Sequence, residues 1–352
     1  MLKRTLYFGN PAYLKTRNEQ IVVQLPASPR PSPEGEGENR EEVRYEEKTI
    51  PIEDTGVVIL DHQQVTISQA LLAKLMDNNV AVISCDNTHH PTGLFLPLSG
   101  HTLQAARFKT QLNASEPLKK QLWQQTIQCK ITNQAALLDQ YQIPNKNMRQ
   151  WAKEVRSGDP DNYEARAAAF YWKNIFGSNA GRESERAEND EWGEEENGET
   201  FSPLSEGRGA GGEAHFLRHR FGEPPNNMLN YAYAILRAIT ARALVGSGLL
   251  PTLGIHHRNQ YNAYCLADDI MEPYRPFADA LVRGILENES PLFTMDTALK
   301  KQLLSLPTVD VEVEGKRSPL MVAMTTTTAS LNSCFEKKRK DIIYPCFPIP
   351  EY

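Results

Sequence analysis

The chain has 352 residues, of which 40% are hydrophobic, and it carries a formal net charge of −6. This length predicts two domains with at least one sizeable core. No uninterrupted apolar run is long enough for a membrane span, and the N-terminus lacks a signal sequence, so we expect a cytoplasmic protein with no membrane partner.

The first quarter of the chain alternates between apolar and polar residues as strands do. "TLYFG" predicts a strand, "AYLKTRNEQIVVQL" predicts a hairpin that turns at Asn18-Glu19, and "TIPIEDTGVVILD" and "VAVISCD" predict further strands. Between the last two, "SQALLAKLMDNN" predicts a helix with Ser68 at its N-cap. These elements predict a small β-rich domain over residues 1–96.

After residue 96 the apolar spacing becomes helical. Helices are predicted over residues 115–141, 161–177, 226–248 and 275–288. Ser115 and Asp161 stand where N-caps are expected, and Gly177 is placed to end the second helix. The third helix is apolar on most sides, which predicts a central, buried position. The fold class is therefore α+β, with the β-rich domain followed by a larger all-α domain over residues 97–352.

The net negative charge of the chain comes from two low-complexity stretches. Residues 182–213 carry a net −8 and residues 28–48 a net −3, which leaves about +5 on the remainder. A mildly basic remainder permits a polyanionic partner. Both stretches are rich in Pro, Gly, Ser and Glu, which predicts mobile insertions at about 26–47 and about 178–215.

Titratable groups are concentrated in "GIHHRNQYNAYCLADDIMEPYRP", residues 254–276. It holds two adjacent histidines and three carboxylates: His256, His257, Asp268, Asp269 and Glu272. The acids also allow a purely structural interpretation, in which they cap helices. The D-x-x-E pairs Asp269/Glu272 and Asp161/Glu164 both fit helix capping boxes. Taken together, nitrogen and carboxylate ligands suit Mg²⁺ or Mn²⁺, which could polarise a phosphodiester in nuclease or strand-transfer chemistry.

The spacing of the cysteines makes a structural zinc site less favoured than a magnesium or manganese site. Five cysteines, at positions 85, 129, 265, 334 and 346, show no CxxC spacing. Structural zinc usually takes paired thiolates, and Cys265 has no such partner. We expect free thiols in a reducing compartment.

Three motifs carry a resemblance to a known family. "EARAAAFYW" (164–172), "LNYAYAILRAITARALVGSGLLPTLGIHH" (229–257) and "NAYCLADDIMEPYRPFAD" (262–279) resemble the CRISPR-associated integrase Cas1 in its type II form. The resemblance implies a metal-dependent endonuclease and integrase that inserts foreign double-stranded DNA into a CRISPR array by 3′-hydroxyl attack. It also implies a homodimer, a larger complex with a Cas2 dimer, and association with the type II effector nuclease.

The resemblance also implies the site residues. Glu164 opens the E-x-x-A-A motif, and the family pattern of Gly, two variable residues and His runs from Gly254 to His257. Glu164, His257 and Glu272 are thereby the catalytic metal ligands, with Asp269 as a further metal-site acid. His256 becomes a neighbour of the site and Asp268 a cap or surface group.

Basic residues are expected to contact the DNA backbone. The candidates are Arg107, Lys109, Arg237, Arg242 and Arg275, together with Lys119 and Lys120.

The chain departs from the family pattern in the distance between Glu164 and His257, which are 93 positions apart because of the acidic insertion. Two other functions stay open from the sequence. One is a stand-alone metal-dependent nuclease on branched or single-stranded DNA. The other is a non-catalytic dimeric DNA-binding scaffold whose acids only cap helices.

Overall fold

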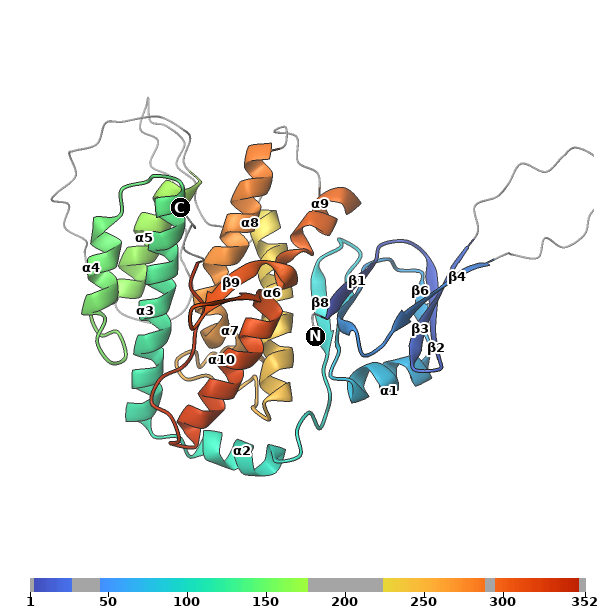
Figure 1. Cartoon of the computed structure of the whole chain (residues 1–352), viewed down its shortest axis with the longest axis horizontal. Coiled ribbons are helices and arrows are strands. Elements are labelled where there is room, and N and C mark those ends of the chain that lie inside the picture. The colour runs from blue at the N-terminus through green and yellow to red at the C-terminus, as the bar shows by residue number, and fades with distance from the viewer. Residues whose placement is uncertain (1–2, 27–44, 177–223, 289–294, 348–352) are drawn as a thin grey trace, which may run out of the picture.

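The computed structural model describes residues 3–26, 45–176, 224–288 and 295–347. Strands occupy the N-terminal part and helices most of the remainder, as the sequence predicts (Figure 1). In the view of Figure 1 the N-terminal strands lie to the right and most of the helices to the left, with α2 (Gln104–Leu112) along the bottom. The α+β class is thereby confirmed.

The N-terminal strands form two four-stranded sheets. In the first sheet the order is β1-β5-β7-β8, with β1, β5 and β7 parallel and β8 antiparallel to β7. The second sheet has the order β4-β3-β2-β6. The strands are β1 (Arg4–Phe8), β2 (Ala12–Arg17), β3 (Gln20–Pro26), β4 (Tyr45–Pro51), β5 (Thr55–Leu60), β6 (Val65–Ile67), β7 (Ala81–Cys85) and β8 (Pro91–Phe95).

The hairpin and the first helix form where the sequence predicts them. Asn18 and Glu19 have φ of 51° and 56° between β2 and β3, because a tight antiparallel turn needs left-handed residues that match the strand twist. Helix α1 (Gln69–Asp77) begins after Ser68, whose hydroxyl accepts a hydrogen bond from the Leu71 amide at 3.3 Å.

The first sheet contacts a core on each of its faces. Successive side chains of a strand point to opposite faces. Val57 and Ile59 accordingly pack into the large helical core, while Val58 and Val82 pack with α1 and the second sheet. Because one face of this sheet belongs to the helical core, the division into domains at residue 96 stays a prediction.

The helical part is built around α6, which is buried on most sides as predicted. Its helices are α2 (Gln104–Leu112), α3 (Glu116–Gln140), α4 (Lys146–Glu154), α5 (Tyr163–Ile175), α6 (Asn226–Gly246), α7 (Cys265–Met271), α8 (Arg275–Asn288), α9 (Thr297–Leu303) and α10 (Leu320–Phe335). Two short 3-10 helices, η1 (Glu272–Tyr274) and η2 (Leu306–Thr308), join them. A hairpin of β9 (Asp310–Val313) and β10 (Lys316–Pro319) was not anticipated.

The C-terminal segment packs along α3. The Tyr344 hydroxyl lies 2.8 Å from the Thr126 hydroxyl, and the Ile342 amide donates to Gln125 Oε1 at 2.9 Å. Farther along α3, Asn133 Nδ2 donates to the carbonyls of Pro345 (3.0 Å) and Pro273 (2.8 Å). The side chain of Asn133 therefore ties α3 both to the C-terminal segment and to η1.

An ion pair joins the strands to the helices. Lys300 Nζ on α9 lies 2.8 Å from Asp61 Oδ2, which follows β5, and both side chains are buried. The Tyr7 hydroxyl also donates to Asp61, and His89 Nδ1 lies 3.0 Å from its other oxygen. The buried carboxylate is thus compensated from three sides.

Several expectations can be compared with the structure directly. Most of the first predicted insertion (27–44) and the second as a whole lie outside the described residues. Pro26 and residues 45–47, which we placed in the first insertion, belong to β3 and β4 instead.

The five cysteines are free thiols, as predicted. No helix among the described residues is long and apolar enough to cross a membrane.

Candidate metal and DNA site

Two of the predicted ligands meet at a lysine. Lys130, on α3, lies with its Nζ 2.7 Å from Glu164 Oε1 and 2.8 Å from Glu272 Oε2. The Lys130 and Glu272 side chains are 9% and 3% exposed, and that of Glu164 is 25% exposed. The structure thus brings together two carboxylates from distant parts of the sequence and places one ammonium group between them.

The loop before α5 positions Glu164. Both oxygens of the Asp159 carboxylate accept amide hydrogen bonds from the first turn, from Tyr163 at 3.0 Å and from Glu164 at 2.9 Å. These bonds satisfy amides that have no partner within the helix. Asp161, which we predicted as the cap, instead pairs with Arg156 at 2.7 Å. The carboxylate of Glu164 therefore does not cap the helix and is free to pair with Lys130.

Glu272 begins η1, directly after α7. Its second oxygen, Oε1, lies 3.0 Å from Arg275 Nη2, and the Arg275 guanidinium lies 5.0 Å from the ring centre of Tyr233. Asn133, one turn after Lys130 on α3, binds the carbonyl of Pro273, the residue next to Glu272. This contact fixes the spacing between the lysine and the carboxylate.

The His257 loop wraps around a buried carboxylate. Asp269 accepts hydrogen bonds from the amides of Ile255 (2.6 Å), His256 (3.0 Å) and His257 (3.1 Å). A Cβ at Gly254 would lie 2.3 Å from the His257 carbonyl and 2.8 Å from Asp269 Oδ2, so only glycine fits at this turn.

Asp269 also orients the imidazole. Its Oδ1 lies 2.6 Å from Nδ1 of His257, which leaves Nε2 as the ring nitrogen that can bind a ligand. The amides and the imidazole use both oxygens of this fully buried carboxylate. Asp269 therefore serves to orient His257, and the structure gives it no free oxygen for a metal ion.

The pKa shifts follow from these contacts. The hydrogen bond that the His257 imidazole donates to Asp269 raises the pKa of His257, although burial opposes the rise. Burial would raise the pKa of the Glu272 carboxyl, but Arg275 and Lys130 outweigh it and hold the pKa below its ordinary value. Partial desolvation of the ring lowers the pKa of the neighbouring His256.

The capping interpretation of the acids is wrong for both D-x-x-E pairs. Neither Asp161 nor Asp269 accepts a hydrogen bond from the helix that follows it, and Glu164 and Glu272 bind cationic side chains instead. Asp268 is neither a cap nor a surface group. It is buried and accepts hydrogen bonds from Arg237 at 2.6 Å and Asn262 at 2.8 Å.

The donor chemistry fits a divalent ion. Glu164 and Glu272 offer carboxylate oxygens, and His257 offers a neutral nitrogen when deprotonated. Glu272 Oε2 is buried and has no well-aligned hydrogen bond, although Lys130 Nζ lies nearby. Within the described residues no three His, Cys, Asp or Glu side chains are arranged closely enough to hold a metal ion. The assignment of Glu164, His257 and Glu272 as the metal ligands thus stays a prediction.

The predicted DNA-binding residues fall into two groups. Lys109 is exposed on α2, and Arg275 lies beside Glu272. The other three make internal contacts.

These internal contacts change the interpretation of each arginine. Arg237 pairs with Asp268, and Arg107 donates to the Ser247 carbonyl at 2.8 Å. Arg242 is only 7% exposed and donates to the Asn79 carbonyl at 2.6 Å, where it joins α6 to the turn before β7. This contact gives Arg242 a structural role within the protein, and its assignment as a DNA-binding residue stays a prediction.

The sequence interpretation missed Lys130 and Asp159. Lys130 lies within the predicted helix 115–141, but nothing in the local pattern separates it from a solvent-exposed lysine. Asp159 follows Gly158, whose φ of +81° marks a tight turn before the helix. A glycine and an aspartate at this spacing could have suggested the cap.

Comparisons with known proteins agree with the fold and identify the family. A family model described as "CRISPR associated protein Cas1" matches residues 6–175 and 218–296. The CRISPR-associated endonuclease Cas1 of Neisseria meningitidis serogroup C is 32% identical, over 100% of this chain and 99% of the relative.

Two solved structures have a similar fold. A casposase bound to its integration product gives a TM-score of 0.68 at 18% identity, over 100% of this chain and 94% of the other. A Cas6-RT-Cas1–Cas2 complex gives 0.63 at 17% identity, over 99% of this chain and 36% of the other. The family model and the full-length relative show that this chain belongs to the Cas1 family of CRISPR-associated proteins.

Proposed function

We propose that the protein is a metal-dependent DNA integrase with endonuclease activity, which inserts short foreign DNA into a CRISPR array. One observation carries the proposal: Glu164 and Glu272 share the Lys130 ammonium, and Asp269 orients His257 with its Nε2 available. The similarity to the Neisseria endonuclease supports the nuclease part. The similarity in fold to a casposase that is bound to an integration product supports the integrase part.

The reaction proposed is a transesterification. The 3′-hydroxyl of the incoming DNA attacks a phosphodiester of the repeat, so that one P–O bond forms as another breaks and no nucleoside triphosphate is needed. Mg²⁺ or Mn²⁺, held by Glu164, His257 and Glu272, would stabilise the negative charge that develops on the phosphate.

Other groups of the protein would orient His257 and bind the DNA. Asp269 keeps the His257 ring in one orientation, which avoids reorganisation during the reaction. Arg275 and Lys130 carry two positive charges beside the carboxylates, where they can bind phosphate oxygens of the DNA.

The partners belong to the same proposal. Double-stranded DNA is the substrate, a homodimer is the working unit, and Cas2 is the bridging partner. The similarity in fold to a chain of the Cas6-RT-Cas1–Cas2 complex supports the assignment of Cas2. Association with a type II effector nuclease and a cytoplasmic location complete the proposal.

The test supplies supercoiled plasmid with a repeat, a short duplex with free 3′ ends, and Mn²⁺. A joined product that is lost in Glu164→Gln and His257→Ala supports the integrase. Glu287→Gln, which removes an exposed glutamate paired with Arg283 on α8, is the matched control. Nicking without joining would favour the stand-alone nuclease, and binding without turnover would favour the scaffold.

A further inference from the structure

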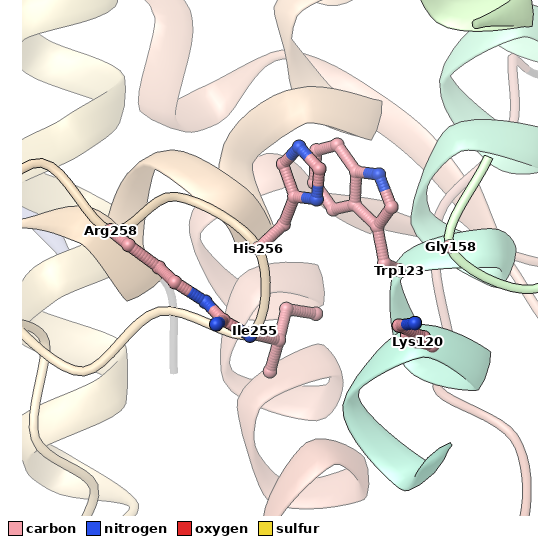
Figure 2. Close-up of a pocket in the computed structure, with 6 residues that line it drawn as sticks. All are labelled: Lys120, Trp123, Gly158, Ile255, His256 and Arg258. Atoms are coloured by element: carbon pink, nitrogen blue, oxygen red, sulfur yellow. The ribbon is translucent and has the colours of Figure 1, made fainter. Parts of the chain in front are cut away.

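A pocket of about 240 Å³ opens beside the His257 loop. Its walls come from α3, from the turn before α5 and from the loop that carries both histidines. The lining residues are Lys120, Trp123, Gly158, Ile255, His256 and Arg258 (Figure 2). The function proposed above uses none of these side chains.

Two aromatic rings form one wall of the pocket. The imidazole of His256 stacks on the indole of Trp123, with ring centres 4.0 Å apart and planes at 1° (Figure 2). Trp123 is buried and belongs to the core, whereas His256 is exposed. The indole therefore holds the imidazole as a flat surface at the edge of the pocket.

Positive charge flanks this surface. Figure 2 shows Arg258 on one side of the stacked rings and Lys120 on the other. Arg258 pairs with the exposed Glu116, while Lys120 has no ion pair in the described part of the chain. Stacking surfaces between basic side chains are the usual means of holding single-stranded nucleic acid.

The wall opposite the histidine is fixed to α3. The Gly158 amide donates to the Lys120 carbonyl at 3.0 Å, and a Cβ at Gly158 would lie 3.3 Å from Lys120 Cδ. In addition, the Trp123 indole N–H is buried without a hydrogen-bond partner among the described residues. The pocket thus has a tightly packed wall, and the unpartnered indole nitrogen is buried within the residue that forms part of its lining.

The pocket lies next to the candidate metal site. His256 and His257 are consecutive, and their ring centres are 5.5 Å apart. A base stacked on His256 would therefore belong to a nucleotide close to the phosphate at His257.

We propose that His256, supported by Trp123, stacks on an unpaired base of the DNA strand that enters the site, and that Lys120 and Arg258 contact the backbone of that nucleotide. This inference rests on the proposed function in so far as DNA occupies the site. It assigns a binding role to His256 that is separate from the predicted metal-binding role of its neighbour His257.

The test measures the binding of a duplex with a single-stranded 3′ end that carries 2-aminopurine, whose fluorescence is quenched by stacking. The experiment is done in EDTA, with the full chain. We expect quenching with the wild type, loss of quenching with His256→Ala, and about 5- to 150-fold weaker binding. His256→Phe should restore both, because it restores a flat ring. A thermal melt of each variant verifies folding.

A matched pair of lysines tests the basic side. Lys120→Ala should weaken binding and reduce its salt dependence, whereas Lys153→Ala, which removes an exposed lysine on α4, should change it less. The proposal is overturned if His256→Ala quenches and binds as the wild type does, or if His256→Phe is as weak as His256→Ala.

The outcomes separate this proposal from the proposed function. If no joined product forms with plasmid while quenching still depends on the ring at position 256, the integrase proposal fails and the stacking site stands. If joining proceeds and His256→Ala quenches normally, the stacking site alone fails.

Discussion

The ammonium of Lys130 should stabilise the protein in the absence of a divalent ion and compete with such an ion when it is present. Replacement by methionine keeps a side chain of similar length and removes the charge. The carboxylates of Glu164 and Glu272 then face each other, with Arg275 as the remaining cation at Glu272.

The structure sets the size of the effect. Removal of one partner from a fully buried ion pair costs about 3–5 kcal/mol. Glu164 is partly exposed, and Arg275 still compensates Glu272, so we expect a loss of about 2–3 kcal/mol for Lys130→Met. For a chain of 352 residues that loss corresponds to a fall in Tm of roughly 3–4 °C, because the entropy of unfolding grows with chain length.

Calorimetry with and without Mn²⁺ tests both parts of the prediction. In EDTA the Lys130→Met variant should melt below the wild type. Mn²⁺ should raise the Tm of the variant more than that of the wild type, because the ion no longer displaces an ammonium group. In titration calorimetry the variant should bind Mn²⁺ about tenfold tighter or more, which corresponds to about 1.4 kcal/mol.

Lys119→Met is the control on the same helix. Its partner Glu116 is exposed, so Lys119→Met should melt close to the wild type, and the small difference should not depend on metal. Equal melting of Lys130→Met and wild type in EDTA, or equal stabilisation of both by Mn²⁺, would refute the reasoning.

Three further predictions follow from the local contacts. Asp159→Ala should cost about 0.5–2 kcal/mol of unfolding free energy through loss of the α5 cap, and a denaturation curve with unchanged midpoint would contradict it. Asp269→Asn should lower the pKa of His257, which is measured by NMR titration of the imidazole; an unchanged pKa would mean that another group raises it. Burial of Asp61 opposes its ionisation, but hydrogen bonds, chiefly from Lys300, hold its pKa below the ordinary 3.8. The carboxylate's contribution to stability should therefore be complete above about pH 3.8 and vanish as the pH falls through the folded pKa. The acid denaturation curves of the wild type and of Asp61→Asn should accordingly converge at low pH. Curves that stay parallel down to the lowest pH would contradict this prediction.

The sequence predicts local structure well where one local signal dominates. Short apolar runs rich in Val and Ile predict β5 and β7, and the hydroxyl of Ser68 marks the start of α1 because it satisfies an amide of the first turn. The buried position of α6 follows from its apolar composition. Such features depend on neighbouring residues alone.

Features that depend on tertiary contacts could not be predicted in this way. Lys130 is one of several lysines on α3, and its role arises only because α5 and η1 bring Glu164 and Glu272 to it. Arg242 in an apolar helix suggests an anionic ligand, but the turn before β7 supplies a carbonyl. The periodicity of a helix shows which face is buried, not which distant group meets a charge there.

The contact of the C-terminal segment with α3 has a consequence for the design of shortened or tagged versions of the protein. Residues 342–345 bind Gln125, Thr126 and Asn133, on the helix that also carries Trp123 and Lys130. A deletion that removes these residues would weaken the packing that holds α3 in place. The positions of Trp123 and of the Lys130 ammonium group both depend on that packing. A fusion joined after Phe347 keeps that support, so the two designs should behave differently even though neither alters a residue of the site.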